Sequence, residues 1–111
     1  MDAPWIPTDT ELGLLVREVG AELQHQEQML VTAESCTGGW LAKALTDRAG
    51  SSAWFAGGVV AYRCQVKQAL LGVNPHTLEQ SGAVSRETVL EMVSGALVHM
   101  DSDVAVAVTG I

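Results

Sequence analysis

Apolar residues recur at helical spacing near the beginning of the chain. Positions 12–23 carry apolar side chains three or four residues apart, and Thr8 and Glu11 form the Thr-x-x-Glu pattern of a capping box. This spacing places the apolar side chains on one helix face, and the capping box marks where the helix begins. The pattern predicts an amphipathic helix of about four turns, preceded by a loose leader over residues 1–7.

Three later stretches are short apolar runs rich in β-branched or aromatic residues, which is typical of strands. They cover residues 29–33, 54–62 and 104–108. Within the second run, Gly57 and Gly58 predict a bulge or a close backbone approach. Because the runs lack a period of two, we expect helices to cover both faces of the sheet they form.

Helical patterns alternate with these strands. We expect helices over residues 39–50, 65–71, 75–80 and 85–100. This alternation predicts an α/β fold: a three-layer α/β/α sandwich with a central, largely parallel or mixed sheet. A chain of 111 residues has the size of one domain, so we assign 1–111 to a single domain.

The turn between the first predicted strand and the next helix concentrates reactive groups. Residues 32–39 supply hydroxyls, a thiol and several backbone N–H groups, which favour an anion or a developing negative charge. Ser35 alone has the type and place of an ordinary helix cap, and Cys36 beside it is a rival nucleophile. No Gly-x-Ser-x-Gly, P-loop or dinucleotide-binding motif is present, so local sequence leaves the choice open.

A nucleophilic serine needs a base, and the three histidines fall at helix ends, where surface positions are usual. Lys67 follows Tyr62, at the end of a predicted strand, by five residues, and the short helix would return it towards that strand end. A lysine is ordinarily a solvated surface charge. When it is buried beside hydroxyls it can act as a base, as in serine–lysine pairs.

Charge and cysteine content restrict the kinds of partner and cofactor that we expect for this protein. The net charge is −7 and the six basic residues are scattered, which argues against a nucleic-acid binder. No apolar run is long enough for a membrane span and no leader signal opens the chain, so we expect no membrane partner and a cytoplasmic location. Cys36 and Cys64 have no metal-ligand spacing, so we expect free thiols, no metal and no cofactor.

Five motifs in this order and spacing carry a resemblance to a known family. They are Ala33–Gly39, Gly50–Phe55, Tyr62-x-x-x-x-Lys67, Gly82–Ser85 and Thr109–Ile111. The chain resembles the CinA C-terminal domain family of competence/damage-inducible proteins, whose stand-alone members are nicotinamide-nucleotide amidases. The resemblance implies hydrolysis of the carboxamide of nicotinamide mononucleotide, a small-molecule substrate, to nicotinic acid mononucleotide and ammonia.

The resemblance also implies roles for particular residues. The family's catalytic positions fall on Ser35, Ser52, Tyr62 and Lys67. In this scheme the serine proton passes to the lysine directly, or through Ser52 or Tyr62. The predicted substrate-binding positions are Glu34, Cys36, Thr37, Gly38, Gly39, Thr109 and Gly110.

The chain departs from the family pattern in two places. Arg63 and Cys64 stand where the family often has Ser-Asn, so Arg63 is a candidate for a phosphate contact or a solvent-facing side chain. The family also continues past Thr-Gly-Ile into a glycine-rich loop, whereas this chain stops at Ile111. We therefore expect a fragment or a shortened member, whose exposed sheet edge favours a homo-oligomer. The alternatives are a non-catalytic binding or interaction domain, and a thiol-dependent enzyme that uses Cys36.

Overall fold

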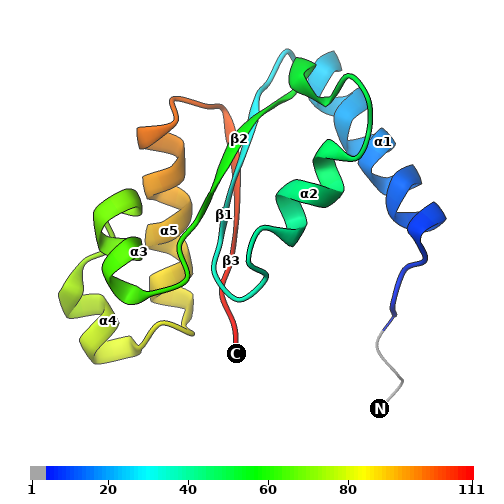
Figure 1. Cartoon of the computed structure of the whole chain (residues 1–111). Helices are drawn as coiled ribbons and strands as arrows, with labels where there is room; N and C mark the ends of the chain where they lie inside the picture. Colours follow the sequence, from blue (N-terminus) through cyan, green and yellow to red (C-terminus); the bar gives the residue numbers. More distant parts are fainter. Residues whose placement is uncertain (1–4) are drawn as a thin grey trace.

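A three-stranded parallel sheet runs through the middle of the molecule, in the order β2–β1–β3 (Figure 1). The computed structural model describes residues 5–111. Its strands are β1 (Leu30–Glu34), β2 (Phe55–Val60) and β3 (Val104–Val108). These are the three strands that the apolar runs predict: the ends of β1 and β2 are shifted by one or two residues, and those of β3 are as predicted.

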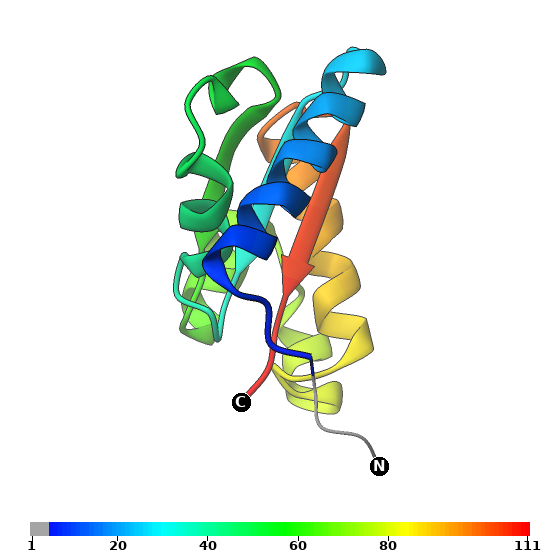
Figure 2. The same ribbon diagram turned by 90° about the vertical axis from the view of Figure 1, so that its right-hand side faces the viewer.

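Helices cover both faces of this sheet. One face carries α1 (Asp9–His25) and α2 (Trp40–Thr46), and the other carries α3 (Cys64–Leu71) and α5 (Arg86–His99) (Figures 1 and 2). The short α4 (Pro75–Ser81) packs against α5, and a 3₁₀ turn, η1 (Ser51–Ala53), precedes β2. The predicted α/β fold with three layers is confirmed. None of the helices within residues 5–111 is long and apolar enough to cross a membrane.

Two apolar clusters lie on opposite sides of β1. Val31 and Ala33 pack with side chains of α3 and α5, whereas Leu30 packs with α1, α2 and Trp54. All five residues of β1 are buried. This two-sided burial explains why the apolar run of β1 shows no alternation.

The helix ends follow the predicted caps. The Thr8 hydroxyl accepts from the Glu11 N–H, and the Glu11 carboxylate accepts from the Thr8 N–H, so the capping box is confirmed. Ser85 caps α5 through the Thr88 N–H. The predicted leader falls partly on residues 1–4, which lie outside the described residues, and residues 5–7 belong to no helix or strand.

The Gly57–Gly58 pair sets the register between β2 and β1. Leu30 pairs with Phe55, but Val31 pairs with Gly57, so β2 carries one extra residue in a bulge. A Cβ at Gly58 would overlap the Thr32 hydroxyl, so the predicted close approach is confirmed. Beyond β2, the Ala61 N–H donates to the Glu34 carbonyl at 2.8 Å, which brings the ends of both strands together.

A second close approach holds α3 against α5. A Cβ at Gly95 on α5 would overlap the carbonyl oxygen of Leu71, the last residue of α3. The backbones can therefore touch only because position 95 has no side chain. This contact fixes the helix that carries Lys67.

Replacing Gly95 by Ala is expected to destabilise the fold, because either the added methyl group or the α3 backbone must move. We expect a loss of about 2–3 kcal/mol in the free energy of unfolding, measured by urea denaturation. Gly13→Ala on α1 is the matched control, since a Cβ there has no neighbour within 4 Å. Removing a helical glycine in open space should instead stabilise by about 0.5–1 kcal/mol. Equal effects of the two changes would contradict this assignment.

Glu91 links α5 to the beginning of α4. Its Oε1 accepts from the Asn74 N–H at 2.8 Å, and its Oε2 accepts from the Thr77 hydroxyl. The Thr77 hydroxyl, and then the Asn74 N–H, hold the pKa of Glu91 below its ordinary value, because both hydrogen bonds favour the carboxylate.

The Glu91→Gln variant is expected to be less stable than the natural chain at pH 7, by about 1 kcal/mol or less because solvent screens the group. A carboxyl group whose pKa is lowered by folding stabilises the fold at pH values above its pKa in the unfolded state. This stabilisation is lost as the pH falls through its pKa in the folded state. The difference should therefore shrink as the pH drops below 4.5. Urea denaturation of both chains at several values between about pH 3 and about pH 7 measures this difference in the free energy of unfolding. Glu79→Gln on α4 is the control, and a difference that grew on acidification would contradict the assignment.

Candidate active site

The ends of the strands bring the reactive residues together at one edge of the sheet. Ser35 directly follows β1, and its N–H donates to the carbonyl of Val108 at the end of β3 at 3.0 Å. Tyr62 follows β2 by two residues. Ligands of open α/β sheets bind at this carboxyl edge.

Lys67 is the centre of the site. The residue is 1% exposed, and α3 returns it to the strand ends as the sequence predicts. Its Nζ lies 2.9 Å from the Ser35 Oγ, 2.9 Å from the Ala61 carbonyl and 2.9 Å from the Tyr62 carbonyl. In the described part of the chain, no carboxylate lies within 4 Å of this amine to form an ion pair.

These three contacts suit a proton acceptor. A neutral amine has two N–H donors and one lone pair. The structure records Nζ as the donor to the Ser35 Oγ and to both carbonyls. A carbonyl can only accept, so in the neutral form the two carbonyls would take both N–H groups and leave the lone pair of Nζ for the Ser35 hydroxyl. The geometry therefore allows Ser35 to donate its proton to Lys67.

A cavity of about 420 Å³ opens over this pair. Its lining combines six predicted site residues, from the three strand ends and α3, with Ala83 of the loop before α5 and Ile111. The lining residues are Ser35, Cys36, Tyr62, Lys67, Ala83, Thr109, Gly110 and Ile111. Ser35 is buried, and Tyr62 is 71% exposed. A small molecule can thus approach the serine from the side of the tyrosine.

The wall formed by Thr109 and Gly110 is held in place by two contacts. The Thr109 hydroxyl donates to the Ala83 carbonyl at 2.7 Å, joining the end of β3 to the loop before α5. A Cβ at Gly110 would lie 3.1 Å from the Cys36 Sγ, so the glycine allows the thiol to lie against the backbone. Both residues line the cavity, as the sequence-based assignment to substrate binding requires.

The turn after Ser35 leaves several N–H groups available. Gly38 and Gly39 have φ values of 62° and 105°, a left-handed region that glycine readily adopts. Within residues 5–111, the N–H groups of Cys36, Thr37 and Gly39 form no hydrogen bond. Of these three residues, Cys36 lines the cavity over Ser35.

Two predicted substrate-binding residues are engaged with each other instead of facing the cavity. The Glu34 carboxylate accepts from the Thr37 hydroxyl and from the N–H groups of Leu41 and Ala42. Glu34 therefore fills the first turn of α2, the place where the sequence suggests an anion of the substrate. Neither residue lines the cavity.

Ser52 lies away from the site. It belongs to η1, which precedes β2, whereas Ser35 follows β1 at the opposite end of the parallel sheet. The six residues of β2 separate these ends by roughly 20 Å at about 3.3 Å per residue. Within one chain, the geometry gives no support to the proton relay through Ser52 that the resemblance implies.

The other candidates from the sequence are dispersed. His25, His76 and His99 are exposed near helix ends, and none of them lines the cavity over Ser35. Arg63 is exposed at the cap of α3, and Cys36 and Cys64 are exposed and not bonded to each other. In the described residues, no group of three or more His, Cys, Asp or Glu side chains could hold a metal ion.

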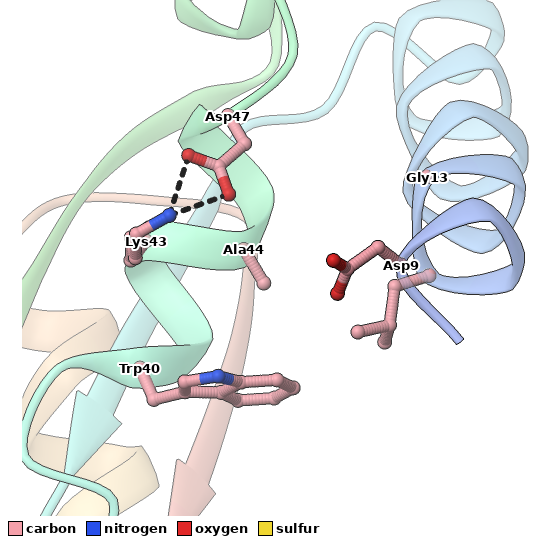
Figure 3. Close-up of a pocket in the computed structure, with 7 residues that line it drawn as sticks. Asp9, Gly13, Trp40, Lys43, Ala44 and Asp47 are labelled. Carbon is pink, nitrogen blue, oxygen red and sulfur yellow. Dashed lines mark hydrogen bonds and ion pairs between the residues drawn. The ribbon is translucent and has the colours of Figure 1, made fainter. Parts of the chain in front are cut away.

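A second cavity, of about 410 Å³, lies between α1 and α2 (Figure 3). It shares no lining residue with the first cavity. Trp40 lies along one side, and the Asp9 side chain extends from α1 into the opening between the two helices. Lys43 and Asp47 form an ion pair at 2.8 Å on the wall. Among the described residues, no serine, threonine or cysteine lines this cavity.

Two features of the site carry no signal in the sequence. The carbonyls of Ala61 and Tyr62 hold the amine, and any residue type supplies a carbonyl. The turn of the Glu34 side chain towards α2 is also unmarked, because it depends on the rotamer and on the path of the backbone.

Comparisons with known proteins identify the family. The model of the CinA C-terminal domain matches residues 14–111. The chain belongs to the CinA C-terminal domain family, which confirms the resemblance drawn from the five motifs.

Named relatives agree with this membership. The chain is 50% identical over 104 residues to the nicotinamide-nucleotide amidohydrolase PncC of Escherichia coli K12, covering 94% of this chain and 63% of that protein. It is 47% identical over 97 residues to a CinA-like protein of Leptospira borgpetersenii, covering 87% of this chain and 23% of that protein.

Solved structures show the same fold. A CinA superfamily protein from Escherichia coli superposes with a TM-score of 0.90 at 36% identity, covering 97% of this chain and 62% of that one. A competence/damage-inducible protein from Agrobacterium tumefaciens has a TM-score of 0.85 at 45% identity, covering 98% of this chain and 65% of that one. The chain thus spans less than two thirds of the length of these relatives.

Proposed function

We propose that the site is an amidase centre that hydrolyses the carboxamide of nicotinamide mononucleotide to nicotinic acid mononucleotide and ammonia. The observation that carries the proposal is the contact between the Lys67 Nζ and the Ser35 Oγ, at the base of a cavity of ligand size. The name of the PncC relative, a nicotinamide-nucleotide amidohydrolase, supports this substrate. On this reading a small-molecule nucleotide is the partner of the site.

The first half of the reaction forms an acyl-enzyme. The Ser35 Oγ attacks the carboxamide carbon while the neutral Lys67 amine takes the hydroxyl proton. The negative charge that develops on the carbonyl oxygen is held by N–H groups of the Cys36–Gly39 turn. Lys67 then gives its extra proton to the leaving nitrogen, the C–N bond breaks, and ammonia departs.

The second half returns the enzyme to its starting form. A water molecule attacks the ester carbon, and Lys67 takes one of its protons as base. The bond between the carbon and the Ser35 Oγ then breaks, and Lys67 returns the proton to the serine. Nicotinic acid mononucleotide leaves with the new carboxylate oxygen derived from water.

The remaining cavity residues have binding roles in this proposal. Tyr62 supplies a carbonyl to Lys67 and an exposed ring that can lie against the pyridine ring. Cys36, Thr109 and Gly110 form the opposite wall. The substrate phosphate binds elsewhere than at the N-terminus of α2, because Glu34 already occupies that place.

We expect Ser35→Ala to lower ammonia release from nicotinamide mononucleotide by at least about 10³-fold, because within residues 5–111 no other hydroxyl hydrogen-bonds to the Lys67 Nζ. Cys36→Ala should keep turnover within about tenfold, since Cys36 lines the cavity but is not among the hydrogen-bond partners of the Lys67 Nζ. Loss of activity in the cysteine variant alone would reverse the assignment of the nucleophile. No ammonia from the natural chain, with the fold intact by circular dichroism, would favour the non-catalytic binding domain.

We expect Lys67→Met to abolish turnover, with a loss of about 10³-fold or more, because it removes the proton acceptor while keeping the side-chain length. Lys43→Met is the matched control, since Lys43 is exposed and pairs only with Asp47. That variant should retain the activity of the natural chain. Coupled detection of ammonia measures both, and turnover in Lys67→Met would remove the lysine from the mechanism.

A further inference from the structure

Glu34 is a buried carboxylate next to the nucleophile, yet it does not face the cavity. The residue is 1% exposed. Its Oε1 accepts from the Thr37 hydroxyl at 2.7 Å and from the Leu41 N–H at 2.7 Å, and its Oε2 accepts from the Ala42 N–H at 2.9 Å. A buried charge requires such partners, and here all three come from the turn and the first helical turn beyond it.

These contacts replace an ordinary helix cap. The first N–H groups of a helix lack partners within the helix, and the N-terminus favours a negative charge. The cap position of α2 is Gly39, which has no side chain to supply one. Glu34 reaches from the end of β1 and supplies the carboxylate instead.

The result is a closed loop around Ser35. At one end, the Ser35 N–H bonds to the Val108 carbonyl, and the Glu34 carbonyl accepts from the Ala61 N–H. At the other end, the Glu34 side chain holds Leu41 and Ala42. The turn between these two anchors carries both the nucleophile and the unpaired N–H groups. Its shape therefore depends on the Glu34 carboxylate.

We propose that Glu34 is a positioning residue for the reaction: its carboxylate closes the Ser35–Gly39 turn so that the serine hydroxyl lies against Lys67 and the unpaired N–H groups of the turn stay available beside it. This inference rests on the amidase function proposed above. Glu34 touches neither the substrate nor the reacting atoms. By filling the helix N-terminus it also reserves the N–H groups of the preceding turn for the oxyanion.

The Glu34→Gln variant tests this role with little change of shape. A glutamine has one acceptor oxygen, so its NH₂ group must face either the Ala42 N–H or the other two donors, and one contact is lost. A misplaced turn should lower kcat by about 10–100-fold while KM changes less than about threefold, because substrate contacts are kept. Thr37→Val removes one of the three contacts and should cause a smaller fall in kcat.

Glu11→Gln is the matched control. Glu11 also bonds to a backbone N–H at a helix start, that of Thr8, but it lies on α1 outside the cavity. This variant should keep kcat and KM unchanged. A rise in KM without a fall in kcat for Glu34→Gln would overturn the inference, because it would make Glu34 a substrate-binding residue.

A second readout separates this inference from the proposed substrate. A fluorophosphonate reacts with Ser35 by forming an Oγ–P bond and expelling fluoride, while the serine proton passes to Lys67. Intact-protein mass spectrometry follows the labelling rate without nicotinamide mononucleotide. If the natural chain labels but releases no ammonia, the amidase proposal fails, and slower labelling of Glu34→Gln still supports the positioning role. Natural rates of labelling in both Glu34→Gln and Thr37→Val would overturn it, and Thr37→Val decides alone if the glutamine variant does not fold.

Discussion

The site depends on one buried amine that joins three segments of the chain. Lys67 comes from α3, Ser35 follows β1, and the carbonyls of Ala61 and Tyr62 follow β2. Inside a protein, a polar group without partners is costly, so each of these contacts constrains the others. The Lys67 amine therefore holds the segments that follow β1 and β2 next to α3, and it is also the base in the proposed reaction.

Backbone proximity, more than side-chain packing, makes this arrangement possible. The bulge and Gly58 bring β2 close to β1, so the segments that follow both strands meet. Gly95 allows α5 to contact the end of α3, and this contact determines how closely the Lys67 side chain approaches the strand ends. These two glycines lie outside the cavity, yet the distances within it depend on them.

Local patterns in the sequence are enough to predict the helices and strands, but not all contacts of the candidate site. The capping box, the apolar runs and the glycine positions predict the helices and strands because each depends on near neighbours along the chain. The Lys67–Ser35 contact also follows, since a short helix after a strand returns to that strand's end. The carbonyl partners of Lys67 and the inward turn of Glu34 do not follow, because they depend on backbone path and rotamer. The resemblance assigns a role to Ser52 through the Gly50–Phe55 motif, but the parallel sheet places this serine at the opposite end from Ser35.

The shortness of α3 has a consequence for how the protein loses function. This helix has eight residues and ends at Gly72, so a local opening of one small segment can withdraw Lys67 while β1 and its neighbours stay paired. Such sub-global opening costs less free energy than complete unfolding. Heat or denaturant should therefore disrupt the Lys67–Ser35 contact before the sheet unfolds. The proposed activity should then be lost at a lower temperature or denaturant concentration than the spectroscopic signal of the whole fold.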